Sequence, residues 1–319
     1  MNMHPRSDTL REHESRLFPR LGFGVGLRAE HYDDVLSGPR RSDWFEAISE
    51  NYIDSGGRPL HVLERVRHDY SVALHGVALS IGSADPLNAQ YLRNLRTLVQ
   101  RIEPALVTDH LCWTAVDGRG LYDLLPLPYT EETLDHVVCR VRQVQDWLGR
   151  RILLENPSTY VQFRHSVFTE WEFLAAVAEA ADCGILLDVN NVYVSAYNHG
   201  FDPVCYLDGI PPARVGQMHL AGFTHMGTYL FDTHSAPVSE PVWRLYAYAV
   251  ERFGPVSTLV EWDADIPTFG RVCAETEHAR RIAEESDAYD ARAYSTAAGV
   301  AALDGGADPQ SGSSRGVLA

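Results

Sequence analysis

The sequence predicts a single (β/α)8 barrel of the α/β class. Strand-like and helix-like segments alternate from about residue 21 to about residue 285, and neither an internal repeat nor a linker divides them into two domains. The strand-like segments are short, β-branched and apolar on both faces, as parallel strands beneath helices are. An open sheet of eight strands is the alternative, because the sequence alone does not prove closure.

The predicted elements follow one another in regular order. We assign residues 19–288 to the barrel, with strands expected at 21–27, 44–49, 71–77, 105–113, 151–156, 184–190, 214–220 and 257–262. Helical spacing is clearest at 89–102, 130–148, 169–181, 240–252 and 268–284. The polar residues 1–18 are predicted to be an N-terminal extension. Residues 289–319, rich in Gly, Ala and Ser, are predicted to be a disordered tail, because they bury too little apolar surface to offset their ordering entropy.

Charge and cysteine usage narrow the class of protein. The 319 residues include 43 acidic and 27 basic ones, for a formal net charge of −16. This charge disfavours a nucleic-acid partner, because phosphate binding needs Lys and Arg, although bound cations would cancel several carboxylates. The five cysteines form no C-x-x-C pair, which argues against disulfides and thiolate zinc sites. Without a signal peptide or a membrane-length apolar run, we expect a cytoplasmic protein with no membrane partner.

Nine metal-compatible side chains stand at or just beyond the ends of the predicted strands. In a (β/α)8 barrel these strand ends converge on one mouth, where the active site is built. Taken singly, each has a plainer interpretation: a strand-end carboxylate such as Asp188 often caps a helix, and an isolated Asp-x-His is common by chance. Together they predict a cluster for several metal ions. The nine are His75, His110, Glu155, Asp188, Asn191, His219, Asp232, His234 and Glu261.

The donor atoms limit the choice of metal. All nine side chains offer nitrogen or oxygen, which excludes a Cys-rich structural zinc site and suits iron, manganese or catalytic zinc. Glu155 and Glu261 each close a strongly apolar strand, and carboxylates can bridge the ions of a multinuclear site. Asp232 and His234 are two residues apart, so in an extended chain both side chains point the same way.

Several of these segments resemble the multinuclear non-haem iron-dependent oxidases, a family in which one member makes the copper chelator methanobactin. The resemblance extends from about residue 21 to residue 285. The segment LLDVNNVYVSAYNHG is its most specific part. The other segments are GVGLRAEHY, ENY, LHGVALSIG, DHLCW, ENPSTY, HLAG, DTH, PVSEPVW and LVEWD.

The resemblance implies a xylose-isomerase-like TIM barrel that holds two or three iron ions, Fe(II) or Fe(III), with O2 as co-substrate. It also implies that the substrate is a residue, usually cysteine, of a ribosomally made precursor peptide, and that a companion protein presents this peptide. The expected catalytic residues occupy the centre of the cluster. The implied division is His75, His110 and Glu155 on one side, Asp188, His219 and Glu261 at the centre, and Asn191, Asp232 and His234 on the other side.

Three other interpretations stay open. The same ligand order resembles endonuclease IV, a trinuclear zinc phosphodiesterase that has His at the position of Asn191. A sugar isomerase-like metalloenzyme with Mg or Mn would be richer in carboxylates than this set. A metal-storing or peptide-binding protein without catalysis is the non-enzymatic alternative. Metal content separates the nuclease from the oxidase, and only turnover excludes the last alternative.

Overall fold

Eight parallel strands close into a barrel in the computed structural model, which describes residues 17–286. Closure confirms the predicted barrel and excludes the open sheet. The predicted tail at 289–319 and nearly all of the predicted extension at 1–18 lie outside the described residues. In their order around the barrel the strands are β1 (Phe23–Gly26), β12 (Ser257–Val260), β9 (Val215–Leu220), β8 (Gly184–Asp188), β7 (Leu153–Glu155), β4 (Leu106–His110), β3 (Ser71–Gly76) and β2 (Trp44–Ile48).

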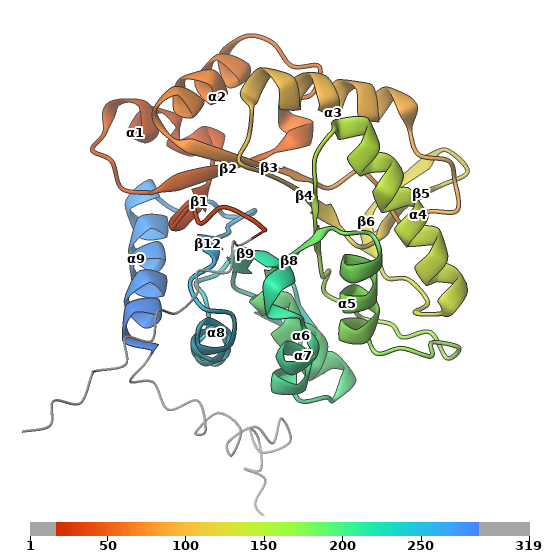
Figure 1. Ribbon diagram of the computed structural model, residues 1–319. Helices are drawn as coiled ribbons and strands as arrows, with labels where there is room; N and C mark the ends of the chain where they lie inside the picture. Colours follow the sequence, from red (N-terminus) through yellow and green to blue (C-terminus); the bar gives the residue numbers. More distant parts are fainter. Residues whose placement is uncertain (1–16, 287–319) are drawn as a thin grey trace, which may run out of the picture.

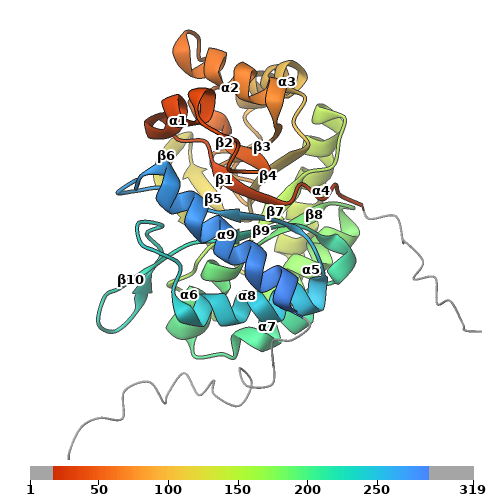
Figure 2. The same ribbon diagram turned by 90° about the vertical axis from the view of Figure 1, so that its left-hand side faces the viewer.

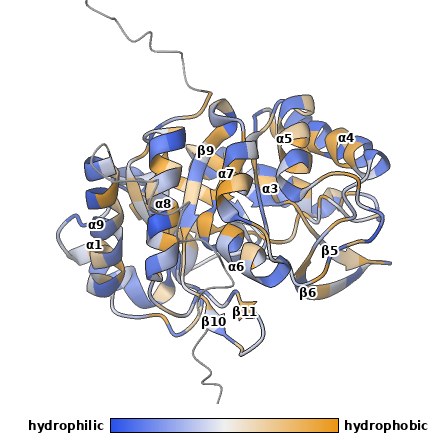
Figure 3. Ribbon diagram, turned by 90° about the horizontal axis from the view of Figure 1, so that it is seen from below, coloured by the Kyte–Doolittle hydropathy of each residue, from blue (hydrophilic) through white to orange (hydrophobic). Residues whose placement is uncertain are grey.

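Every barrel strand is followed by at least one helix, and the helices surround the strands (Figure 1). Apolar and polar residues alternate around helices such as α4 and α8, so that each can turn an apolar stripe towards the barrel (Figure 3). None of the helices within residues 17–286 is long and apolar enough to cross a membrane. The helices are α1 (Tyr32–Ser37), α2 (Arg58–Asp69), α3 (Ala89–Ile102), α4 (Glu131–Leu148), α5 (Glu170–Ala180), α6 (Val189–His199), α7 (Pro203–Gly209), α8 (Glu240–Phe253), α9 (Phe269–Glu285) and the short 3-10 turns η1 (Ala29–His31), η2 (Ser49–Asn51) and η3 (Pro212–Arg214).

Capping residues explain why three of the predicted helices begin where they do. The side chains of Asn88 and Thr130 accept hydrogen bonds from the first backbone amides of α3 and α4. Thr169 and Glu172 form a reciprocal capping box at the start of α5. Helix α4 ends at Leu148 and is followed by Gly149, whose left-handed conformation suits glycine.

Two hairpins interrupt the alternation at the end of the barrel where the strands finish. β5 (Trp113–Val116) and β6 (Arg119–Leu125) lie between β4 and α4, and β10 (Thr224–His225) and β11 (Leu230–Phe231) lie between β9 and α8. Figure 2 shows the loop that carries β10 projecting from the body of the barrel. The strand predicted at 105–113 therefore combines β4 with the first residue of β5. The strand predicted at 184–190 ends earlier, at Asp188, because that residue caps α6.

The barrel interior is divided into an apolar layer and a polar layer. The apolar layer is a cluster of Trp44, Ala73, Leu106, Leu153, Leu186 and Leu259, against which Phe18 and Leu21 pack. Because side chains alternate along a strand, the next inward position lies two residues further on. On five of the six strands that position carries a carboxylate or imidazole, namely Glu46, His75, Glu155, Asp188 and Glu261. The strands thus place metal-compatible donors directly above an apolar plug.

Candidate metal centre

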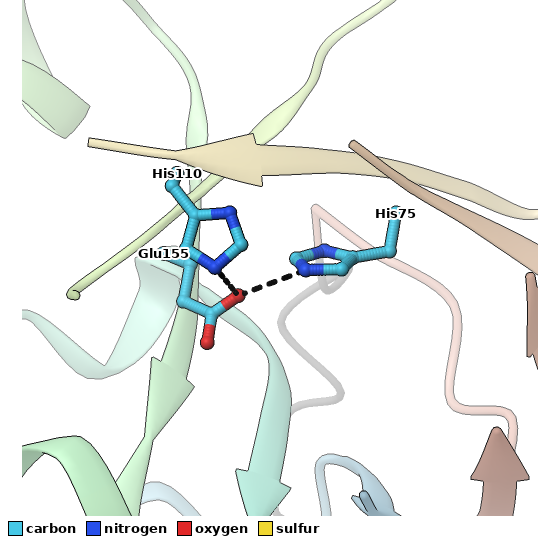
Figure 4. A group of neighbouring side chains, drawn as sticks. All are labelled: His75, His110 and Glu155. Atoms are coloured by element: carbon cyan, nitrogen blue, oxygen red, sulfur yellow. Dashed lines mark ion pairs between the residues drawn. The ribbon is translucent and has the colours of Figure 1, made fainter. Parts of the chain in front are cut away.

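One group of donors comes from the ends of β3, β4 and β7. The Nε2 atoms of His75 and His110 lie 3.4 and 3.3 Å from the same Oε2 atom of Glu155 (Figure 4). The other ring nitrogens are held: Nδ1 of His75 lies 2.7 Å from Thr108 Oγ1, and Nδ1 of His110 donates to the Gly76 carbonyl at 3.1 Å. Burial and the His75 ring hold the pKa of His110 well below its usual value. This direction favours the neutral ring, the form in which imidazole binds metals.

A second group lies at the centre and shares Glu155 with the first. Nδ1 of His219 lies 3.1 Å from Glu261 Oε2 and 3.7 Å from Glu155 Oε1. Asp188 has two roles. Its Oδ1 atom accepts a hydrogen bond of 2.7 Å from the backbone amide of Asn191 and caps α6, while its Oδ2 atom is buried without a hydrogen bond from any described residue. The helix cap and the metal-ligand interpretation of Asp188 are therefore compatible, because each uses a different oxygen.

The third group combines the start of α6 with the loop after β11. Nε2 of His234 lies 2.8 Å from Asp232 Oδ1 and 4.0 Å from Asp188 Oδ2. Asn191 donates to the Asn156 carbonyl at 3.0 Å. The predicted reason for the pairing of Asp232 with His234 is wrong, because β11 ends before them and His234 has a left-handed φ of 45°. A turn, not an extended strand, brings the two side chains together.

All nine predicted side chains thus gather at the mouth, and seven of them belong to groups of closely spaced ligand atoms. Among the residues that the structure describes, four groups of three have ligand atoms that all lie within 4.8 Å of one another: His75 with His110 and Glu155, Glu46 with His219 and Glu261, Glu155 with Asp188 and His219, and Asp188 with His234 and Glu261. Of the buried side-chain atoms within residues 17–286 that have no hydrogen-bond partner, five belong to the predicted ligands: Glu155 Oε2, Asp188 Oδ2, Asn191 Oδ1, His219 Nδ1 and His234 Nε2. Buried polar atoms are normally paired, so lone pairs that converge in this way fit bound cations.

The pKa shifts record the same crowding of negative charge. Burial raises the pKa of Glu155 well above its usual range, and the Asp188 and Glu261 carboxylates add to the rise, although His219 opposes it. Burial likewise raises the pKa of Asp188 to about 7. Glu261 differs, because His219 and His234 overcome its burial and hold its pKa well below the usual value. Bound cations would favour the ionised form of every carboxylate in the cluster.

Glu46 on β2 is a further member of the site that the sequence did not predict. Its Oε1 atom lies 3.0 Å from His219 Nε2, and its Oε2 atom accepts the Gln217 amide at 2.5 Å. Glu46 therefore fixes the ring whose Nδ1 faces Glu155 and Glu261. The available signal was the register of WFEAI, in which Glu46 stands two residues after the buried Trp44.

Asp263 and Arg28 were also missed. Asp263 Oδ2 lies 3.0 Å from His234 Nδ1, so it orients this ring towards Asp232 and Asp188. Arg28 pairs with Asp263 at 2.5 Å and donates to the Trp262 carbonyl at 3.0 Å. The only hint in the sequence was that Asp263 follows Glu261 so closely in LVEWD.

A cavity of about 810 Å³ opens above the donors. Its wall includes the ligand candidates His75, His110, Asn191, Asp232, His234 and Glu261, together with Arg28, Tyr52, Leu124 and Ile266. A cavity of this size accommodates a substrate of several residues or a small molecule. The donors are therefore buried in the barrel but reachable from its mouth.

Solved structures that resemble this chain share its fold. D-psicose 3-epimerase from Clostridium cellulolyticum H10, with D-tagatose, matches with a TM-score of 0.51 and 12% identity over 85% of this chain and 99% of that chain. A xylose isomerase-like TIM barrel/4-hydroxyphenylpyruvate dioxygenase fusion protein matches with a TM-score of 0.56 and 15% identity over 84% of this chain and 43% of that one. At such identities the likeness shows the fold alone, and it confirms the predicted xylose-isomerase-like barrel.

Sequence relatives are much closer. A UPF0276 protein of Anaeromyxobacter sp. (strain Fw109-5) is 59% identical over 262 residues, which cover 82% of this chain and 93% of the relative. A UPF0276 protein of Acaryochloris marina (strain MBIC 11017) is 55% identical over 258 residues, 81% of this chain and 93% of the relative. The family model for the RiPP precursor modification enzyme MbnB/TglH/ChrH, where RiPP denotes a ribosomally made and modified peptide, matches residues 22–284. The chain belongs to this family.

Proposed function

We propose that this protein is an iron-dependent oxidase that uses O2 to modify a cysteine of a ribosomally made precursor peptide. The observation that carries the proposal is the convergence of buried nitrogen and oxygen donor atoms beneath an open cavity. A donor set of imidazoles, carboxylates and one amide suits iron. The family supplies the peptide substrate class, since its description is that of a precursor modification enzyme.

The three groups of donors would hold two or three iron ions. Glu155 and Glu261 each face two groups, so they are the candidates for bridging carboxylates. Bound iron would supply redox chemistry with O2 and an open position for a substrate thiolate. The ligand sets would be His75, His110 and Glu155 for the first ion, Glu155, Asp188, His219 and Glu261 for the central ion, and Asn191, Asp232 and His234 for the third.

The remaining parts of the site would position the reactants. Glu46 and Asp263 hold the second nitrogens of His219 and His234, which keeps the opposite ring nitrogens aimed at the metals. The apolar plug beneath the donors closes the barrel from below and keeps water away from them. The cavity above receives the peptide residue, and a companion protein would present the rest of the precursor.

Turnover with defined metals tests this proposal. The protein is loaded anaerobically with Fe(II) and mixed with O2 and a cysteine-containing precursor encoded beside its gene. We expect an O2-dependent mass change in the peptide that Asp188→Asn and His219→Ala abolish. Glu275→Gln serves as the control, since Glu275 is buried on α9 and pairs with Arg271 instead of lining the cavity. Zinc-dependent cleavage of abasic DNA without any change in the peptide would instead support the endonuclease alternative.

A further inference from the structure

Exposed apolar side chains gather on the loop after β7 and on the β10–β11 hairpin. They lie beside the large cavity above the donors, which we call the metal cavity. We call Tyr160, Val161, Phe163, Tyr229 and Phe231 the aromatic strip. Their exposed fractions are 40%, 57%, 39%, 39% and 43%. The Tyr160 ring lies 5.6 Å from the Phe231 ring and 6.2 Å from the Tyr229 ring. Single exposed apolar residues need no explanation, but a contiguous group of this kind marks a binding surface.

One end of the aromatic strip joins the metal cavity directly. The Tyr160 hydroxyl accepts a hydrogen bond of 3.0 Å from the backbone amide of Asp232, whose side chain lines the cavity and contacts His234. Phe231 immediately precedes Asp232 in the chain. A molecule that lies on Tyr160 and Phe231 therefore reaches the rim of the cavity without crossing another surface.

The other end leads to a second, smaller cavity. Val161 and Phe163 line a hollow of about 240 Å³ whose wall includes Phe168, Trp171 and Phe201. The Trp171 and Phe201 rings lie 5.3 Å apart. This hollow has the size and the lining to receive one large apolar side chain. Strip and hollow together form a path from the metal centre to an aromatic pocket.

We infer that the aromatic strip binds an extended stretch of the precursor peptide, with an apolar side chain seated in the small cavity while the modified residue occupies the large one. This inference rests on the proposed peptide substrate. The aromatic strip adjoins the rim of the large cavity. When one residue of a peptide lies inside that cavity, the neighbouring residues of the peptide must cross the rim. The substrate peptide is therefore the molecule expected to lie on the strip. In an extended peptide each residue advances about 3.3 Å, so the seated side chain stands at a fixed number of residues from the modified one.

Synthetic peptides provide the probe. Short fluorescein-labelled Gly/Ser peptides carry one Cys and a Phe-Val-Phe block at increasing distances from it, and a peptide with Cys alone is the reference. Anisotropy of the iron-loaded protein without O2 measures binding. Burial of one large apolar side chain favours binding, so we expect the peptide with the best spacing to bind roughly tenfold more tightly than the reference peptide. Equal binding of all peptides would overturn the inference.

Paired variants locate the binding surface. Val161→Ser with Phe163→Ser should abolish the advantage of the block. Val116→Ser with Leu121→Ser on the β5–β6 hairpin is the matched control, because these side chains are also 39% and 40% exposed, and it should leave the advantage unchanged. The inference is contradicted if both pairs of substitutions abolish the advantage of the block, or if neither pair does. So does a concentration-dependent dimer that only the Val161/Phe163 pair disrupts, since a second copy would then be the occupant.

Oxidation of the same peptides separates this inference from the proposed function. Strip-dependent binding without any O2-dependent mass change would leave the strip as a peptide site and remove the oxidase. Cysteine oxidation that is equally fast in the wild-type protein and in the Val161/Phe163 variant would leave the oxidase and remove the strip.

Discussion

Single residues outside the ligand set determine where the ring nitrogens point. His219 is fully buried, and its Nε2 atom lies 3.0 Å from Glu46. Although burial disfavours a charged ring, the carboxylates of Glu46, Glu261 and Glu155 raise the pKa of His219 well above its usual value. Glu46 thus holds the ring in place and leaves Nδ1 for a metal. Loss of a partner of this kind typically lowers metal affinity or activity by about 10- to 100-fold.

Glu46→Gln should therefore weaken iron binding without unfolding the barrel. The amide keeps the shape of Glu46 but removes the charge that anchors His219, so we expect the affinity for Fe(II) to fall by about 10- to 100-fold. Anaerobic titration with a competing chelator measures the change. Glu275→Gln is the control, since Glu275 is also buried but pairs with Arg271 on α9. An unaltered affinity in Glu46→Gln, or an equal loss in the control, would refute this role.

Glu170 should make stability depend on pH independently of the metal centre. Burial raises the pKa of its carboxyl group from 4.5 to about 7, although hydrogen bonds from Tyr206 and Tyr129 oppose the rise. The folded state therefore binds a proton that the unfolded state releases, so this contribution to stability is complete below about pH 4.5 and is lost as pH rises through 7. As the pH rises from 5 to 8, the Tm of Glu170→Gln should fall less than the Tm of the wild-type protein. Parallel Tm profiles would contradict this assignment.

Strands and helices place the donors by a simple alternation. On five strands a buried apolar residue is followed two positions later by a carboxylate or imidazole, so the apolar plug and the donor layer are built by the same segments. The plug is tightly packed: a side chain at Gly24 would overlap the Trp44 ring, whereas one at Gly120 in β6 would meet no described atom within 4 Å.

Gly24→Ala should consequently destabilise the barrel. The added methyl group must displace Trp44, and overpacking of this kind costs about 1–3 kcal/mol. Urea unfolding measures the difference, with Gly120→Ala as the matched control that should be close to neutral. If the two variants have the same free energy of unfolding, the plug is not packed as described.

The same alternation explains what the sequence can and cannot predict at this scale. The strand ends that carry His75, Glu155 and Asp188 could be predicted from the sequence, because each of these residues closes a conspicuous apolar run. The alternation did not reveal Glu46, since an acidic residue inside a strand is easily taken for a solvent-facing one. It also gave the wrong geometry for His234, whose left-handed turn depends on the loop around it. The short hairpin strands β10 and β11 are too brief for any periodicity.

The whole molecule brings together donors that are far apart in the sequence. Closure of the barrel makes His75 and Glu261 neighbours of the same centre, and the βα order alone predicted that convergence. Bound ions would link six strands and the loop after β11 through their coordination bonds. Metal binding is therefore expected to stabilise the native state as a ligand does.

Removal of iron should lower the thermal stability of the protein. At a free Fe(II) concentration one hundred times its Kd, one site contributes about 2.7 kcal/mol, and several sites contribute more. Scanning calorimetry should show a lower Tm after anaerobic chelation and recovery after Fe(II) is added back. In a His75→Ala, Asp188→Asn double variant, chelation and the addition of Fe(II) should each change the Tm less than in the wild-type protein. A Tm that is indifferent to chelator and iron in the wild-type protein would mean that the donors hold no metal.

Anomalous diffraction from crystals loaded anaerobically with Fe(II) tests the central claim most directly. Data collected above and below the iron absorption edge locate iron independently of any assumed ligand. We predict two or three iron peaks among His75, Glu155, Asp188, His219, His234 and Glu261, with Glu155 or Glu261 between neighbouring peaks. Iron found elsewhere, or these side chains paired only with one another in the absence of a peak, would contradict the account.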